Sequence, residues 1–263
     1  MTAPLAFDAA TVIIARESEP DGHGLEILLI ARHPASRFAA GEYVFPGGRI
    51  EPEDAAPGIE AVCAGLSREE AARRLADQNA PDRALGFWVG AIREVFEEVG
   101  LLFAYGSDGA LVPLDHARLV ALQQAYADNA KSFSDLIRAH GLRLATDRLH
   151  YYAYWITPEE RKLRFSTRFF VAEAPEAQEI LLDTKESTEF RWLSPQDALA
   201  ENGRGSLPLH FPTIRILREL CEIRRVDALL AAARGRMIRP IMPRIVVEDG
   251  RERFLMPGDP GYY

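Results

Sequence analysis

The chain has 263 residues, of which 48% are hydrophobic and 27% are charged, and its formal net charge is −8 at pH 7. This composition is typical of a globular protein with one large domain or two small ones, and no apolar run approaches the roughly 18–20 residues that a membrane span needs. The negative charge argues against general nucleic-acid binding, which requires a basic surface. An anionic substrate would therefore need local arginines or a bound cation to offset the field of the protein.

The N-terminal segment and the cysteines predict a reducing compartment. Charged residues flank the short apolar stretch 11–15, with Asp8 before it and Arg16, Glu17 and Glu19 after it, so the segment lacks the design of a secretory signal. Cys63 and Cys221 are too few and too isolated for a disulfide framework or a zinc site, and the six histidines show no metal-ligand spacing. We therefore expect a cytoplasmic protein without membrane contact. The oligomeric state stays open, with a homodimer as one option.

Two apolar, β-branched stretches open the chain and predict a β-hairpin. They are residues 10–15 (ATVIIA) and 25–31 (LEILLIA), and the turn-like sequence EPDGHG separates them at 19–24.

Two helices are predicted next. Ser67-Arg68-Glu69-Glu70 is typical of a capping box, which predicts a helix from there to about Asn79. The second helix is predicted over Asp82–Val99, because Gly100 suits the left-handed cap that ends a helix.

The second half of the chain alternates between the two kinds of element. The predicted helices are 115–139, with a break near 129–132, then a short helix from Ser194-Pro195, and a long one over 213–234. The predicted strands are 149–156, 168–172 and 188–193, followed by a closing hairpin of 244–247 and 253–256 around the turn 248–250. Without internal repeats or a convincing linker, these elements predict one mixed sheet sandwiched between helices.

The stretch REVFEEVGL, residues 93–101, is the most informative part of the sequence. On a helix of 3.6 residues per turn, Glu94, Glu97 and Glu98 share one face. Three carboxylates this close repel one another unless a cation lies among them, and oxygen ligands suit a hard ion such as Mg²⁺ or Mn²⁺. The alternative is an ordinary solvated helix face. The preceding sequence decides between the two.

Residues 45–50 (FPGGRI) and 93–101 together resemble the two halves of the Nudix box, G-x5-E-x7-R-E-U-x-E-E-x-G-U, in which U is apolar. Counting from Gly48, the first glutamate of the pattern falls on Asp54, and Glu53 is the alternative that keeps the glutamate but shifts the register by one. Between Asp54 and Arg93 lie 38 residues where the pattern has seven, which leaves an insertion of 31 residues, 55–85.

The resemblance implies an α+β fold, the Nudix-type α/β/α sandwich with a mixed sheet. It also implies one Nudix hydrolase domain over residues 1–263, with a helical insertion at about 55–85 and a C-terminal extension at about 211–263 that includes helices.

The same resemblance assigns roles within the box. The glutamates that match Glu94, Glu97 and Glu98 coordinate divalent ions in this family, with the backbone carbonyl at the position of Gly47. The arginine that matches Arg93 is structural there. It should pair with Asp54 or Glu53 and fix the loop against the helix, which suits a planar guanidinium.

Residues 28–48 resemble the coenzyme A signature of certain Nudix enzymes, L-L-T-x-R-S-x3-R-x3-G-x3-F-P-G-G, with two departures. Arg32, Arg37 and Gly41 match in register. Because coenzyme A carries a 3′-phosphate beside its diphosphate, and a guanidinium binds phosphate bidentately, Arg32 and Arg37 are candidate substrate-phosphate ligands. Arg168 is a further candidate. The alternative is that the two matching arginines are surface residues that flank a strand.

The split box, WITP at 155–158, TRFF at 167–170 and PGDP at 257–260 look like the branch that contains the peroxisomal coenzyme A diphosphatases. That similarity spans most of the chain and implies hydrolysis of coenzyme A or an acyl-CoA to 4′-phosphopantetheine and adenosine 3′,5′-bisphosphate. The chain ends in Gly-Tyr-Tyr and not in a Ser-Lys-Leu-type signal, so we do not infer a peroxisomal address.

An acidic cluster precedes Trp192 and offers a further metal ligand or general base, because many Nudix enzymes place a carboxylate on a loop before such a strand. Glu186 is our first choice and Glu189 the second, and the alternative is that both solvate a loop. We expect a small-molecule nucleotide as the only partner class. Two other functions stay open: hydrolysis of NADH or ADP-ribose, and a Nudix-fold binding module that has lost catalysis.

Overall fold

The computed structural model describes residues 4–18, 24–36, 38–76, 81–129, 132–248 and 250–262. Most of the predicted turn at 19–24, the predicted helix end at Asn79 and the candidate ligand Arg37 lie outside this range. Within it, no helix is both long enough and apolar enough to cross a membrane.

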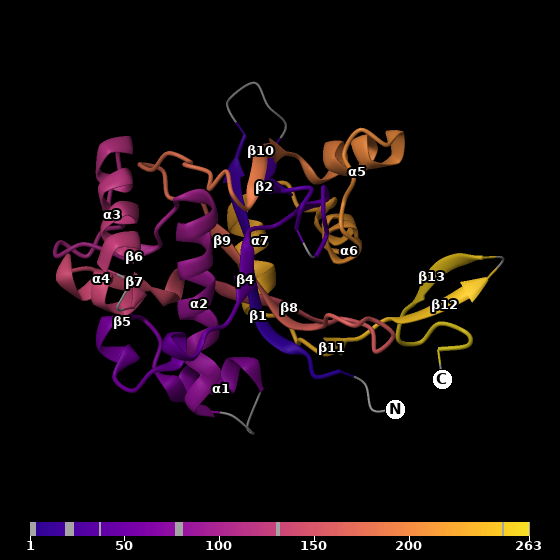
Figure 1. Ribbon diagram of the computed structural model, residues 1–263, viewed down its shortest axis with the longest axis horizontal. Helices are drawn as coiled ribbons and strands as arrows, with labels where there is room; N and C mark the ends of the chain where they lie inside the picture. Colours follow the sequence, from indigo (N-terminus) through magenta and orange to yellow (C-terminus); the bar gives the residue numbers. More distant parts are fainter. Residues whose placement is uncertain are drawn as a thin grey trace.

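A mixed eight-stranded sheet occupies the centre of the fold (Figure 1). Its order is β10 (Ser187–Leu193), β2 (Leu25–Arg32), β1 (Phe7–Glu17), β9 (Phe165–Glu173), β8 (His150–Ile156) and β11 (Pro240–Ile241). Two short strands lie off this path, β3 (Tyr43–Val44) beside β2 and β4 (Gly47–Arg49) beside β1. The predicted first hairpin is confirmed, since β1 and β2 pair antiparallel with Ala15 opposite Ile27. β1 also runs parallel to β9, which makes the sheet mixed.

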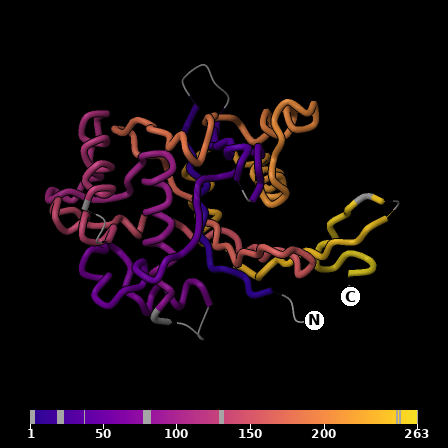
Figure 2. Tube along the Cα trace, viewed as in Figure 1, coloured from indigo at the N-terminus to yellow at the C-terminus, as the bar shows by residue number. Residues whose placement is uncertain are grey.

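Both faces of the sheet are buried, because successive side chains of a strand point to opposite sides. Val12 and Ile14 of β1 belong to a core beneath α2 (Pro81–Val99), whereas Ile13 belongs to a second core with α6 (Phe211–Leu220) and α7 (Val226–Arg234). Figure 2 traces the path of the chain through the same arrangement. The predicted α/β/α sandwich is therefore confirmed.

Helix α2 carries the predicted carboxylate face and lies under the sheet along its apolar side. Trp88 is fully buried and its Nε1 donates to the carbonyl of Leu149 at 3.0 Å. The helix ends where predicted, because Gly100 adopts the left-handed conformation with φ +76°.

The segment between the two half-motifs contains more than helix. After η1 (Pro52–Ala55) follow η2 (Ile59–Val62), β5 (Cys63–Ala64) and α1 (Arg68–Leu75), whose N-cap Ser67 accepts from the backbone of Glu70 as predicted. Strand β5 pairs with β7 (Arg143–Ala145), which pairs with β6 (Ala104–Tyr105). The prediction of one sheet was therefore wrong: strands of two or three residues are too short for a periodic signal.

The remaining helices follow the predicted order, with one correction. The segment 115–139 forms α3 (His116–Asn129) and α4 (Phe133–Ala139), η3 (Thr146–Arg148) precedes β8, and α5 (Pro195–Arg204) follows β10. The predicted continuous helix over 213–234 was wrong. It is divided into α6 and α7, because Glu17 at the end of β1 accepts from the backbone N–H of Val226 at 3.0 Å and fixes a new helix start there.

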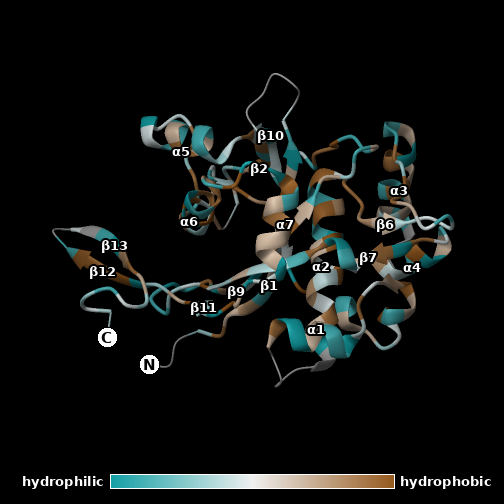
Figure 3. Ribbon diagram, turned by 180° about the vertical axis from the view of Figure 1, so that it is seen from behind, coloured by the Kyte–Doolittle hydropathy of each residue, from teal (hydrophilic) through white to brown (hydrophobic). Residues whose placement is uncertain are grey.

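The closing hairpin is present as β12 (Arg244–Glu248) and β13 (Arg251–Leu255), with the turn residue Asp249 outside the described residues. It forms a sheet of its own and projects from the body at the same end as the C-terminus (Figures 1 and 3). The fold therefore has a layered body and a separate C-terminal hairpin.

Candidate active site

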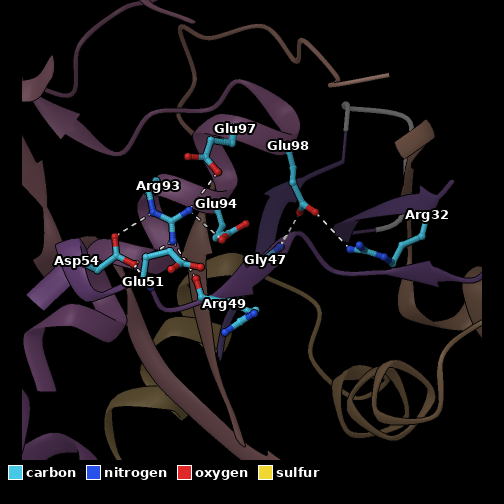
Figure 4. Close-up of polar contacts among 9 residues, drawn as sticks. All are labelled: Arg32, Gly47, Arg49, Glu51, Asp54, Arg93, Glu94, Glu97 and Glu98. Carbon is cyan, nitrogen blue, oxygen red and sulfur yellow. Dashed lines mark hydrogen bonds and ion pairs between the residues drawn. The ribbon is translucent and has the colours of Figure 1, made fainter. Parts of the chain in front are cut away.

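A buried ion pair joins the two halves of the split motif (Figure 4). Arg93 donates from Nε and Nη2 to the two oxygens of Asp54, both at 2.9 Å, and the side chains are only 8% and 2% exposed. Nη2 also donates to the carbonyl of Arg49 at 2.8 Å. The predicted pairing is confirmed with Asp54, whereas Glu53 is exposed. The two halves of the motif therefore lie in contact although the insertion separates them in the sequence.

Glycines on α2 allow the shorter aspartate to reach. A Cβ atom on Gly90 would lie 2.8 Å from Asp54 Oδ2, and one on Gly86 would lie 2.9 Å from the Cβ of Ala55. Helix η1 therefore packs directly against the α2 backbone, and this close approach offsets the missing methylene. The pair Gly86 and Gly90, four residues apart on one helix face, was the available sequence signal for this contact.

Two more glycines bring β4 against the carboxylates. The backbone N–H of Gly47 donates to Glu98 Oε2 at 2.7 Å. Gly47 has a φ of +150°, which side chains rarely adopt, and a Cβ there would lie only 2.3 Å from the carbonyl oxygen of Ala10. A Cβ on Gly48 would lie 2.4 Å from Glu94 Oε2. The loop sequence FPGG is thus required for the strand to pass between β1 and the two glutamates.

The electrostatic environment disfavours the charged carboxylates. Burial raises the pKa of Glu94 to about 7, although Arg93 opposes the shift. Burial and the charge of Glu94 raise the pKa of Glu98 to about 8, while the Gly47 N–H and Arg32, whose Nη1 lies 3.4 Å from Glu98 Oε1, act in the other direction. A bound proton or cation would stabilise both groups.

Arg93 stays charged in this setting. Burial disfavours its guanidinium, but the hydrogen bonds and charge of Asp54, together with Glu94 and Glu97, outweigh that effect and raise the pKa of Arg93. Its Nη1 donates to Glu94 at 2.9 Å and to Glu97 at 3.1 Å.

The three glutamates share one helix face, as predicted, but they are not equivalent. Glu94 and Glu98 line a cavity, whereas Glu97 does not. Burial raises the pKa of Glu97, and Arg93 and the hydroxyl of Tyr126 on α3 act in the other direction. No three Asp, Glu, His or Cys side chains of the described residues converge on one point as they stand. The carboxylate oxygens of Glu94 and Glu98, which lie in one cavity, nevertheless have the chemistry that a hard divalent cation requires. Nothing in the sequence pointed to Tyr126.

The cavity beside Glu94 and Glu98 has a volume of about 1000 Å³ and extends from β4 to the C-terminal hairpin. Arg32, Gly47 and Glu186 also line it. A smaller cavity of about 440 Å³ lies between β8, β9 and α7 and contains none of the box carboxylates.

Two predicted site residues lie elsewhere. Arg168 is a correction: it is buried within the sheet, where its Nη1 donates to Ser166 Oγ at 2.7 Å and its guanidinium lies 3.6 Å from the ring centre of Tyr154. It does not line the large cavity, because its position on β9 points it toward α2. Glu189 is exposed on β10 and also lies outside the cavity, so Glu186 is the acidic residue of that loop in the better position.

The ion pair yields a stability prediction. We expect Asp54→Ala to lower the free energy of unfolding by about 3–5 kcal/mol, because it leaves a buried guanidinium without its partner. Denaturant unfolding measures the effect. Glu53→Ala is the matched control, since Glu53 is exposed on the same turn and should change stability by less than about 0.5 kcal/mol. Equal effects in the two variants would contradict the assigned pairing.

The raised carboxyl pKa values yield a pH prediction. A carboxyl group whose pKa is higher in the folded protein stabilises the fold when protonated. That contribution is complete below its ordinary value of 4.5 and disappears as the pH rises through the folded values of about 7 and about 8. Without divalent metal, the Tm should therefore fall from about pH 5 to about pH 8. Glu98→Gln should reduce this fall, whereas Glu179→Gln, on an exposed residue, should not. An unchanged slope in Glu98→Gln would refute the assignment.

Comparisons with known proteins agree with this geometry. A family model described as the NUDT19 Nudix domain matches residues 7–220. Putative nudix hydrolase 7 of Caenorhabditis elegans is 24% identical over 253 residues, which cover 95% of this chain and 72% of that protein. Acyl-coenzyme A diphosphatase NUDT19 of Xenopus laevis is 26% identical over an alignment of 271 positions, which covers 90% of this chain and 71% of that protein.

A solved structure supports the same conclusion. The crystal structure of a NUDIX hydrolase from Alicyclobacillus acidocaldarius has a TM-score of 0.69 and 25% identity, and the match covers 86% of this chain and 96% of the other. Members of this family hydrolyse phosphoanhydrides and generally use divalent metals. Since the family model spans most of the chain and includes both halves of the split box, the protein belongs to the Nudix hydrolases, in their coenzyme A diphosphatase branch.

Proposed function

We propose that this protein hydrolyses the diphosphate of coenzyme A or an acyl-CoA to 4′-phosphopantetheine and adenosine 3′,5′-bisphosphate. The observation that supports this most is that the partly buried Glu94, the buried Glu98 and the Arg32 guanidinium that pairs with Glu98 line one cavity, which is large enough for a nucleotide conjugate. The printed activity of the Xenopus relative supports the choice of substrate.

The carboxylates would hold Mg²⁺ or Mn²⁺. Glu94 and Glu98 line the cavity, and the box pattern adds Glu97 and the backbone of Gly47 as ligands. When bound, a divalent ion would neutralise charge on the diphosphate and activate the water nucleophile.

The protein itself supplies orientation and proton transfer. The N–H of Gly47 fixes Glu98 Oε2, and Arg93 fixes Glu94, so neither carboxylate is free to rotate. Arg32 offers charged donors to a phosphate oxygen beside Glu98. Glu186 lines the cavity and would accept the proton of the attacking water as general base.

The function is tested by a substrate panel with Mg²⁺ or Mn²⁺, with the products separated by chromatography. We expect turnover of coenzyme A or its thioesters. Glu97→Gln or Glu98→Gln should lower turnover roughly a thousandfold, because each removes several kcal/mol of charge stabilisation. Glu186→Gln should lower it roughly a hundredfold or more, whereas Glu189→Gln, outside the cavity, is the control and should leave it unchanged.

Three outcomes would contradict this proposal or parts of it. Near-normal turnover in both Glu97→Gln and Glu98→Gln, with intact folds, would remove the metal-site assignment. Hydrolysis of NADH or ADP-ribose in preference to coenzyme A would keep the chemistry and change the substrate. Absence of turnover on the whole panel would favour the binding-module alternative.

The position of Arg32 yields a prediction about substrate recognition. Because its guanidinium lies beside Glu98, we expect it to contact the diphosphate that all these substrates share. Arg32→Ala should then lower kcat/KM for coenzyme A and for its 3′-dephospho form by similar factors, roughly ten- to a hundredfold. Arg32→Lys, which keeps the charge, is the control for electrostatics alone. A loss confined to coenzyme A would instead place the 3′-phosphate at Arg32, as the signature resemblance implies.

A further inference from the structure

The C-terminal hairpin is a two-stranded sheet that projects from the body (Figure 1). Among the described residues, β12 pairs with β13 alone, so its outer edge has no strand beside it. Bonded and non-bonded residues alternate along an antiparallel ladder, and every second residue of β12 therefore turns its backbone N–H and C=O away from β13. Two strands by themselves are only marginally stable in water, and an open edge is a template for a further strand.

The two strands of the hairpin have different surroundings. On β13, Phe254 stacks on Phe211 of α6 with ring centroids 4.2 Å apart, and Glu252 accepts two hydrogen bonds from Arg161, at 3.1 and 2.6 Å. On β12, the middle residues 245–247 are all apolar and β-branched (brown in Figure 3), and Val247 is 69% exposed. The body thus holds the hairpin at β13 and leaves an apolar, strand-forming segment at the outer side.

The ends of β12 carry opposite charges. Arg244 donates from Nη1 to the carbonyl of Tyr262 in the C-terminal tail at 2.6 Å, and its Nε lies 4.0 Å from Glu160. Glu248 is exposed and accepts from Arg253 through Oε1 at 3.1 Å. Arg244 Nη2 and Glu248 Oε2 remain for a further contact. No described residue outside the hairpin forms a backbone hydrogen bond with β12, so the tail does not occupy the edge.

The sequence of β12, Arg-Ile-Val-Val-Glu, is complementary to itself. When two copies pair antiparallel about a twofold axis at Val246, Arg244 lies opposite Glu248 of the second copy and Ile245 lies opposite Val247. Arg244, Val246 and Glu248 are alternate residues, so they share one face of the strand and both ion pairs form on that face. Opposed unlike charges and opposed β-branched side chains stabilise neighbouring strands. The edge therefore fits a second copy of the same chain.

Two other strand edges fit a second copy less well. The same pairing of β13 is centred on Arg253 and places two arginines directly opposite each other, which is destabilising. On β10, at the edge of the central sheet, the pairing register shifts between Ser187 and Glu189, and such irregularities protect edges from pairing. Arg191 of β10 is also held by Glu201, at 2.6 and 2.8 Å. The self-complementary edge is therefore β12.

We propose that two copies of this protein associate through β12 and form a continuous four-stranded antiparallel sheet about a twofold axis at Val246. Twofold symmetry is the commonest arrangement of homo-oligomers. The five residues of β12 are few beside the roughly 20–30 residues a side of a standard interface, so the dimer should dissociate on dilution through the micromolar range. The association does not depend on the proposed hydrolysis, and either can fail without the other.

The experiment is sedimentation equilibrium of the full chain over a range of concentrations, without ligand. Glu248→Arg should weaken the dimer roughly ten- to thirtyfold, because two like-charge pairs replace the two ion pairs. Arg244→Glu should do the same with acidic pairs. An equimolar mixture of these two variants should form a heterodimer, since each strand with two arginines then lies opposite a strand with two glutamates. Effects within one chain cannot produce this recovery.

Two further variants test the edge itself. Val246→Lys should also give a monomer, because it places two lysines opposite each other at the axis, and it leaves both ion-pair residues unchanged. Glu189→Arg is the matched control, a charge reversal on the exposed edge strand β10, whose Phe190 is 40% exposed. It should leave the dimer intact.

Each result decides for or against the association. A dimer that is weakened by Glu248→Arg and by Val246→Lys, and that recovers when Glu248→Arg and Arg244→Glu are mixed, would support it. A monomer at all concentrations of the unaltered protein would overturn it. So would a dimer that persists in Val246→Lys, or one that is lost in Glu189→Arg, which would place the contact at β10. Failure of the mixture to form a heterodimer would overturn the proposed pairing of Arg244 with Glu248.

Discussion

The buried ion pair between Arg93 and Asp54 is the contact on which the geometry of the site depends. Its guanidinium uses Nε, Nη1 and Nη2 at once, binding Asp54, the carbonyl of Arg49 and the carboxylates of Glu94 and Glu97. Removing two charges from water is costly, so such a pair persists only where the geometry is close to ideal and the remaining donors are bonded. That requirement fixes β4 and η1 against α2, although the two halves of the motif are far apart in sequence.

The close approach of backbones is the second constraint. Gly47 and Gly48 let β4 pass between β1 and the glutamates, and Gly86 and Gly90 let η1 lie on α2. A side chain at any of these positions would displace the loop, the helix or a carboxylate. The split motif therefore forms one unit because glycines on both halves let them meet, and the insertion extends the core that contains α2.

The cavity links the body of the fold with the segment that follows it. The family model ends at residue 220, yet α7 completes the core on one face of the sheet, and β13 supplies part of the cavity wall. The reacting groups thus come from the central motif, whereas the far wall comes from the C-terminal hairpin. Such a division would allow the chemistry to stay fixed while the preference for the distant part of a substrate changes.

The sequence alone determined the local features. The carboxylate face of α2, the Gly100 cap, the first hairpin and the split box follow from spacing and propensity, which act over a few residues. Only the tertiary structure decided which carboxylates line the cavity, Glu94 and Glu98 but not Glu97, since that depends on where β4 and its glycines lie against α2. It also chose Asp54 over Glu53, because burial and the glycines of α2 set the reach of the side chain. The burial of Arg168 against Tyr154 and the division between α6 and α7 were not predicted from the sequence for the same reason. Both depend on contacts between residues that are distant in the sequence, which no local pattern contains.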